Sequence, residues 1–222
     1  MEKGKTYVAM ILDKSGSMMA VRKSSLESFN DQIKVLREES KKNSQETILS
    51  IVLFDHEIVV KEKGAEIDLI KEISETEYIP SGMTALYDAI GQTIARFEKS
   101  YELKENDAVL FVIVTDGFEN SSIEFSGVQG QKTIKDKIKE LTDSKQWTFT
   151  FVGTELALDQ ADSFGIHNTL RFDTTPQGMS SLTDHQATAY SMYFNSRSVG
   201  ETSVDNLYGG IEQSQEEGED DL

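Results

Sequence analysis

The chain has 222 residues, 37% of them hydrophobic, which is enough for one sizeable folded domain. It contains no cysteine, so disulfide frameworks, thiolate metal sites and thiol nucleophiles are excluded. The formal net charge of −17 argues against a general nucleic-acid binder, because phosphate contacts require clustered Lys and Arg. The first apolar stretch, residues 7–12, is too short for a secretory signal or a membrane-spanning helix. We therefore expect a cytoplasmic protein with no membrane or nucleic-acid partner.

The first part of the chain alternates short apolar runs with a helical pattern. Residues 6–12 and 47–54 are apolar runs of the kind found in strands buried on both faces. Between them, a helical period places on one face Leu26, Phe29, Ile33 and Leu36. The segment EIVVKEK follows the second strand after only Asp55 and His56, which is too short for a helical crossover. We therefore predict an antiparallel hairpin partner there.

The second part of the chain continues the same alternation. After the loop IPSGMT, one face of a predicted helix carries Leu86, Ile90, Ile94 and Phe97. Residues 108–115 form the most apolar run, so we predict a central strand there. A helix marked by Ile134, Ile138 and Leu141 follows, and then the strands WTFTFVG and TLRFD. The last predicted helix has Thr175 as its N-cap and Pro176 in its first turn.

Strands separated by helices of this length favour a mostly parallel sheet with helices on both sides. The predicted fold class is therefore α/β, a doubly wound, mostly parallel central sheet with one antiparallel edge strand. We assign residues 1–195 to this domain. Residues 196–222 carry eight acidic residues and one arginine, and we interpret them as an acidic, disordered tail.

Oxygen-bearing side chains follow the ends of two predicted strands. Asp13 follows the first strand, and Ser15 and Ser17 come next at alternate positions, so their side chains can face the same way. Asp116 follows the central strand, and Thr84 stands just before a helix. Ligands of open α/β sheets bind at the carboxyl edge of the strands, so we expect these side chains to converge. Carboxylates and hydroxyls without His or Cys suit Mg²⁺, Mn²⁺ or Ca²⁺ rather than zinc.

Each of these segments also has an ordinary structural explanation. Ser15, Ser17 and Thr84 could cap helices, and Asp116 followed by Gly117 could be a turn. The occurrence of all three segments, in this order on this strand pattern, favours the metal site. Because hydroxyls carry no charge, such a site would leave a dication partly uncompensated and would favour an anionic ligand from outside.

At these residues the sequence resembles the von Willebrand factor A (vWA) domains. The segment DKSGS at residues 13–17, the threonine of SGMTALYDAI and the TDG around Asp116 look like the three parts of their metal-ion-dependent adhesion site. The resemblance spans roughly residues 5–195 of the chain. The segments TALYDAI and TFTFVGTELALDQADSFGI are also similar to small stand-alone members from bacteria and their phages.

The resemblance implies the Rossmann-like fold of the family and a Mg²⁺ ion with a defined ligand set. Direct hydroxyl ligands would be Ser15, Ser17 and, in one conformational state, Thr84, while Asp13 and Asp116 would ligate directly or through water. An acidic residue of a partner protein would complete the shell. Beside the site we expect Lys14 to face solvent, whereas Phe118 either packs locally or contributes to the partner-binding surface.

The main alternative class is an enzyme. Phosphoryl-transferring hydrolases also place a metal beside an aspartate such as Asp13, but they typically carry a second acid at the position of Ser15. The sequence has no G-x-x-x-x-G-K-[ST] loop, and its three histidines are scattered: His56, His167 and His185. No nucleophile–base pair can be assembled near the site, so we predict no catalytic residue. A divalent-metal-dependent hydrolase of phosphate esters is kept as the alternative function.

The sequence thus predicts a Mg²⁺-dependent protein–protein interaction module, an adaptor or scaffold that binds an acidic residue of its partner. The resemblance to vWA domains suggests an AAA+ ATPase as that partner. The tail raises a second hypothesis, because Leu207, Tyr208 and Ile211 stand among acidic residues as in short docking peptides. Its carboxylates could occupy the metal site of the same or a neighbouring chain, which would give self-association.

Overall fold

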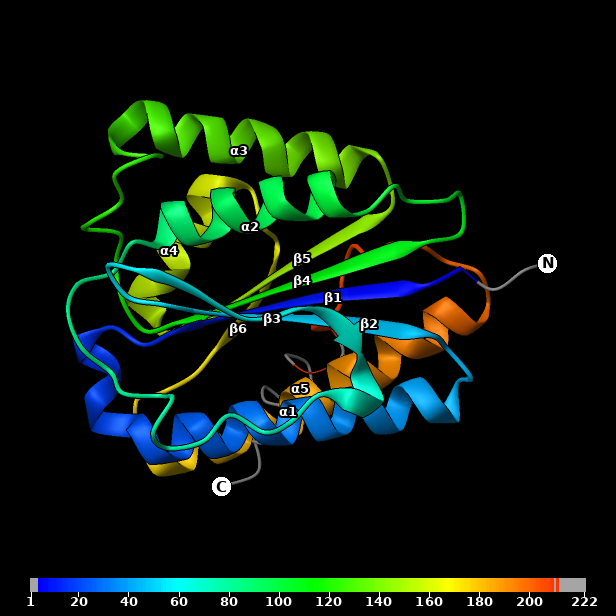
Figure 1. Ribbon diagram of the computed structural model, residues 1–222, viewed down its shortest axis with the longest axis horizontal. Helices are drawn as coiled ribbons and strands as arrows, with labels where there is room; N and C mark the ends of the chain where they lie inside the picture. Colours follow the sequence, from blue (N-terminus) through cyan, green and yellow to red (C-terminus); the bar gives the residue numbers. More distant parts are fainter. Residues whose placement is uncertain (1–3, 210, 212–222) are drawn as a thin grey trace, which may run out of the picture.

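A six-stranded sheet divides the molecule into two layers of helices in the computed structural model, which describes residues 4–209 and 211 (Figure 1). The strand order is β3-β2-β1-β4-β5-β6. The strands are β1 (Thr6–Asp13), β2 (Thr47–Phe54), β3 (Ile58–Glu66), β4 (Ala108–Thr115), β5 (Trp147–Gly153) and β6 (Asn168–Arg171). All neighbouring strands are parallel except β2 and β3, which form an antiparallel hairpin. The predicted α/β class, with one antiparallel edge strand, is confirmed.

The two helical layers come from different parts of the chain. One face of the sheet is covered by α1 (Arg22–Lys42), preceded by the short helix η1 (Gly16–Val21), and by α5 (Pro176–Ser198) (Figure 1). The other face is covered by α2 (Leu86–Ser100), α3 (Gly127–Asp143) and α4 (Glu155–Phe164). The remaining short helix, η2 (Ile67–Leu69), follows β3. Within the part of the chain that the structure describes, no helix combines the length and apolar character that a membrane span requires.

The central strands β1 and β4 are buried at every residue. Their alternate side chains contribute to two separate cores, so that Met10 packs with the α1 and α5 side chains while Ile11 packs with those of α2, α3 and α4. Burial on both faces explains why these strands are continuous apolar runs rather than alternating ones. Between β1 and β4 the covering helices change from one face to the other, which is the topological switch point of the sheet.

Helix α5 begins as the sequence predicts. Thr175 is its N-cap, and the Thr175 hydroxyl accepts a hydrogen bond from the Gly178 backbone N–H at 3.0 Å. We expect Thr175→Ala to lower the free energy of unfolding by about 1 kcal/mol, because one backbone donor of the first turn loses its partner. Urea unfolding measures the change. The matched control is Ser181→Ala, at an exposed position inside the same helix, where we expect a change below about 0.5 kcal/mol. Equal effects of the two substitutions would contradict the capping role.

The chain beyond residue 195 belongs to the packed structure as far as Ile211. Helix α5 continues to Ser198, and the side chains of Leu207, Tyr208 and Ile211 are only 0%, 2% and 4% exposed. The Leu207 N–H donates to Asn168 Oδ1 of β6 at 2.7 Å. The domain boundary predicted at residue 195 therefore comes too early, and these three side chains belong to the core instead of a docking peptide. The rest of the predicted tail, residues 212–222, lies outside the described residues.

Candidate metal site

The predicted site residues lie at the carboxyl ends of β1 and β4. Asp13 is the last residue of β1, and Asp116 directly follows the last residue of β4. Because these two strands are parallel neighbours, their carboxyl ends meet at the left-hand edge of the sheet in Figure 1. Thr84 reaches the same edge from the loop that precedes α2. The site therefore forms at the topological switch point, where open α/β sheets bind ligands.

Hydrogen bonds connect four of the five predicted residues. The Ser15 N–H donates to Asp13 Oδ1 at 2.6 Å, and the Ser15 and Ser17 hydroxyl oxygens lie 3.1 Å apart. The Ser17 hydroxyl in turn donates to Asp116 Oδ1 at 2.6 Å. The alternation of the two serines thus turns both hydroxyls toward the same cluster of oxygen atoms.

Gly117 shows that Thr84 belongs to the same cluster. A Cβ atom at position 117 would lie 3.4 Å from Thr84 Oγ1, 3.5 Å from Ser17 Oγ and 4.0 Å from Asp13 Oδ2. One point beside the Gly117 backbone, which belongs to the third loop, is therefore surrounded by side-chain oxygen atoms from the first and second loops. The structure brings together all five residues predicted from the sequence, while their role as metal ligands stays a prediction.

The two carboxylates of the site lack a positively charged partner among the described residues. Asp13 is fully buried, and this burial raises its pKa to about 6, although a hydrogen bond from the Thr115 hydroxyl at 2.6 Å acts in the opposite direction. Burial also raises the pKa of Asp116. Neither carboxylate has an ion-pair partner among the described residues. Because a buried, unpaired negative charge is unfavourable, a bound cation would stabilise this arrangement.

The three loops are tied to one another by hydrogen bonds outside the cluster. The Gly16 N–H donates to the Gly82 carbonyl at 3.1 Å, which joins the first loop to the second. The Thr84 N–H donates to Asn120 Oδ1 at 2.8 Å, and the Asn120 N–H donates back to the Thr84 carbonyl at 2.9 Å. Asn120 therefore positions Thr84. Sequence reasoning missed Asn120, because its only local signal is an amide in a turn after a strand.

Two further contacts beside the site were not expected from the sequence. The buried Tyr78 hydroxyl donates to the Asp13 carbonyl at 2.9 Å, which fixes the end of β1. Lys14 pairs with the buried Asp55 at the end of β2, and its side chain is only 13% exposed. The expectation that Lys14 faces solvent is wrong, because the tight β2–β3 turn places a carboxylate next to it.

The chemical type of the ligand atoms in the site determines which metal ions it could bind. The described residues contain no group of three or more His, Cys, Asp or Glu side chains that could hold a metal ion. The site instead offers two carboxylates and three hydroxyls, all oxygen donors, which suit a hard cation such as Mg²⁺ rather than zinc. The predicted residues therefore fit the ion that the sequence resemblance implies. The three histidines lie elsewhere: His56 in the β2–β3 turn, His167 before β6 and His185 within α5.

Comparison with known proteins then identifies the family. Residues 8–199 match the family model described as the von Willebrand factor type A domain. The chain belongs to this family. A search among curated proteins gives no match for this vWA domain.

Solved structures share the fold of this vWA domain at low sequence identity. A von Willebrand factor type A protein from Catenulispora acidiphila is 13% identical with a TM-score of 0.61, over 85% of this chain and 43% of that one. The PilB minor pilin from Streptococcus sanguinis is 13% identical with a TM-score of 0.57, over 86% and 63%. The vWF domain of the type V pili tip protein Mfa5 from Porphyromonas gingivalis is 11% identical with a TM-score of 0.59, over 87% and 97%. This chain thus spans less than two thirds of the first two, and at these identities the likeness shows the fold alone.

Proposed function

We propose that this vWA domain is a Mg²⁺-dependent protein–protein interaction module whose ion is held by Asp13, Ser15, Ser17, Thr84 and Asp116. The observation that carries the proposal is the convergence of two unpaired carboxylates and three hydroxyls from three loops at one edge of the sheet. Mn²⁺ and Ca²⁺ are alternative ions with the same preference for oxygen ligands.

The residues of the site divide into a buried part and an exposed part. Asp13, Ser15 and Thr84 are buried, whereas Ser17 is exposed and Asp116 is half-buried. Access from solvent is therefore open on the side of Ser17. On that side a bound Mg²⁺ would remain open to a further oxygen ligand, such as a carboxylate of a partner protein.

Each of the three loops carries an exposed apolar side chain close in sequence to a site residue. Met19, Met83 and Phe118 are 52%, 56% and 44% exposed, and each stands within two residues of Ser17, Thr84 or Asp116. Large apolar side chains that are exposed near a polar site favour contact with a partner protein. Methionine is suited to such contacts because its flexible side chain adapts to surfaces of different shape. We infer that the partner presents an Asp or Glu flanked by apolar side chains.

Affinity capture in Mg²⁺ and in EDTA tests this function. We expect the full chain to capture its partner in Mg²⁺ and to lose it in EDTA, and Asp13→Ala to give no capture in either buffer. Replacing the metal-binding Asp or Glu of the captured partner should abolish binding as well. Undiminished capture in EDTA would contradict the proposal.

The apolar side chains can be tested in the same experiment. Phe118→Ser and Met83→Ser should weaken capture by about tenfold, the effect of losing roughly 1.4 kcal/mol of binding free energy, while leaving Mg²⁺ affinity unchanged. The matched control is Leu69→Ser, which removes an exposed apolar side chain far from the site, in η2. An equal loss with Leu69→Ser would remove the evidence for a partner surface around the site.

The alternative function, a metal-dependent phosphate-ester hydrolase, has less support. Ser15 occupies the position where such a hydrolase carries its second acid, and its hydroxyl lies beside that of Ser17. Two structural neighbours are a minor pilin and a pilus tip protein, which is in keeping with a binding role. An AAA+ ATPase as partner and a relationship to small bacterial or phage members remain predictions of the sequence resemblance. A cytoplasmic location remains a prediction from the short first apolar stretch.

A further inference from the structure

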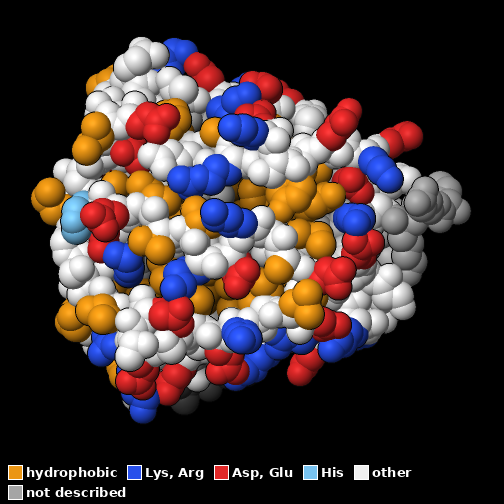
Figure 2. Space-filling view, viewed as in Figure 1, with side chains coloured by type: hydrophobic (Ala, Val, Ile, Leu, Met, Phe, Trp, Pro, Cys, Tyr) orange, Lys and Arg blue, Asp and Glu red, His pale blue; other side chains and the backbone are white. Residues whose placement is uncertain are grey.

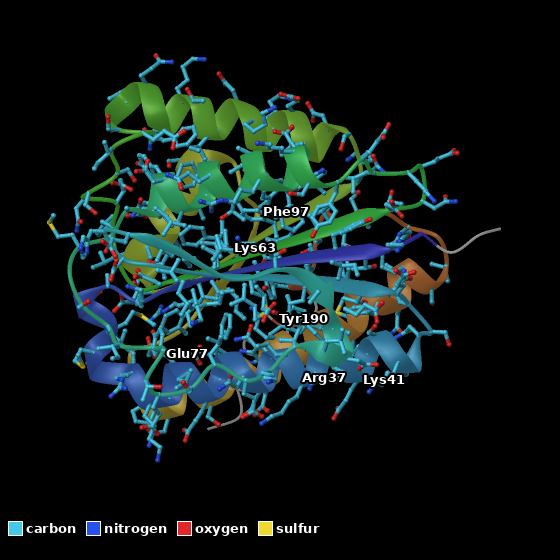
Figure 3. The ribbon with its side chains drawn as sticks, in the orientation of Figure 1. Arg37, Lys41, Lys63, Glu77, Phe97 and Tyr190 are labelled. Atoms are coloured by element: carbon cyan, nitrogen blue, oxygen red, sulfur yellow. The ribbon has the colours of Figure 1, made fainter. Side chains whose placement is uncertain are left out.

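A cavity of about 260 Å³ lies between α2 and the strands β2 and β3, on the face of the sheet opposite α1 and α5. Figure 3 shows Phe97 on α2 and Lys63 on β3 at the two sides of this region. On the same face, Figure 2 shows hydrophobic side chains gathered beneath α2, with Lys and Arg side chains beside them. None of the five candidate metal ligands lines the cavity, so it is separate from the proposed metal site.

The cavity has apolar side chains on two opposite walls. Val52 of β2 and Val60 of β3 form the wall on the sheet side, and Phe97 and Tyr101 form the wall on the side of α2. The other lining residues are polar or charged, and a combination of apolar walls with polar groups is typical of small-molecule sites. The volume suits an apolar body of the size of one aromatic ring or a short alkyl chain.

One buried hydroxyl in the lining has no partner. Thr93 is 2% exposed, it lines the cavity from α2, and its Oγ1 atom makes no hydrogen bond within the described structure. Unsatisfied buried hydroxyls are rare because they lose their bonds to water without replacement. An acceptor atom of a bound ligand would satisfy the Thr93 hydroxyl.

The charged lining residues favour an anion. Lys63 and Arg96 line the cavity, and neither forms an ion pair with a described carboxylate; the Arg96 guanidinium donates only to the Gln92 side-chain oxygen, at 3.1 Å. Glu62 is the one acidic residue among the lining residues that the structure describes. The lining is thus net positive on a chain whose net charge is −17. Arg96 lies three residues after Thr93, on the same face of α2, so both can reach one anionic group.

We propose that this cavity binds a small organic monocarboxylate with an apolar body of the size of benzoate. The apolar body packs against Val52, Val60 and Phe97, and the carboxylate accepts hydrogen bonds from the Thr93 hydroxyl and the Arg96 guanidinium. This inference is independent of the proposed metal site.

Titration of the full, ¹⁵N-labelled chain with benzoate tests the proposal, with benzyl alcohol as the uncharged counterpart. We expect benzoate to cause saturable shifts of the backbone amide signals of Thr93, Phe97 and Tyr101, and benzyl alcohol to bind at least tenfold more weakly. Absence of saturable shifts at these amides would overturn the proposal. Equal affinity for the alcohol would do the same, because it would show a merely apolar cavity.

Two variants and a control locate the carboxylate. Arg96→Gln and Thr93→Val should each weaken benzoate binding threefold or more, and Thr93→Val should not lower the melting temperature because its hydroxyl has no partner to lose. Lys99→Gln removes the same charge from an exposed position of α2 outside the cavity, and it should leave the affinity unchanged. An equal effect of Lys99→Gln would indicate general charge attraction and would contradict the assigned site.

Discussion

Asp13→Asn is expected to weaken Mg²⁺ binding about 100-fold or more and to leave the metal-free protein at least as stable at pH 7 as the natural chain. The Asp13 carboxylate accepts from the Ser15 N–H and from the Thr115 hydroxyl, each at 2.6 Å. An asparagine can keep both contacts, because its Oδ1 accepts from Ser15 while its Nδ2 donates to the Thr115 oxygen. The substitution therefore removes the charge and preserves the local hydrogen bonding.

The pH dependence of stability follows from the raised pKa of Asp13. The pKa of Asp13 is about 6 in the folded state, whereas its ordinary value is 3.8. Ionisation of this carboxyl therefore costs more free energy in the folded chain than in the unfolded chain, and folding is penalised wherever the folded carboxylate is ionised. This penalty is absent below about pH 4, grows as the pH rises, and is complete above about pH 6, where it reaches roughly 3 kcal/mol. In EDTA, the stability gain of Asp13→Asn should accordingly be largest at pH 7 and vanish near pH 4.

Calorimetric titration and urea unfolding check the two parts of this prediction. We expect the Mg²⁺ dissociation constant to rise about 100-fold or more, which corresponds to about 2.7 kcal/mol. The matched control is Asp184→Asn, which removes an exposed carboxylate of α5 and should change neither quantity. Unchanged Mg²⁺ affinity in Asp13→Asn would contradict the assigned ligand set, and a loss of folding would contradict the role assigned to the buried charge.

Leu207→Ala is expected to lower the free energy of unfolding by about 2–5 kcal/mol. Leu207 is fully buried in the core formed with α1 and α5, so the shorter side chain leaves a cavity there. Leu156→Ala, at a position of α4 that is 63% exposed, is the matched control and should cost less than about 0.5 kcal/mol. If Leu207→Ala were as mild as the control in urea unfolding, the segment after α5 would not be part of the folded core.

The elements that the sequence predicts correctly are those with a strong local pattern. The apolar run of β4 indicates a strand covered on both faces, and the two residues between β2 and β3 leave room only for a hairpin. The prediction for the segment after α5 is wrong because its many acidic residues indicate a solvent-exposed chain. Its burial depends on distant partners, such as Asn168 for Leu207 and Gln186 for Tyr208, which no local pattern reveals.

The candidate site likewise contains residues that a local pattern reveals and residues that depend on distant contacts. Its five residues could be found because each stands at the end of a strand or the start of a helix, and such positions meet at one edge of a parallel sheet. The residues that support them could not be found in this way. Asn120 acts on Thr84 from 36 positions away, and Tyr78 acts on the Asp13 carbonyl from 65 positions away. The pairing of Lys14 with Asp55 likewise depends on the close approach of β1 and β2.

The most direct test of the proposed metal site is an anomalous difference map from crystals of the full chain grown with Mn²⁺, an ion that the same oxygen donors accept. We predict one strong peak in contact with the Ser15 and Ser17 hydroxyl oxygens, beside the Asp13 and Asp116 carboxylates, and no peak there in crystals of Asp13→Asn. Mn²⁺ bound only elsewhere on the chain, or an equal peak in Asp13→Asn, would contradict the account.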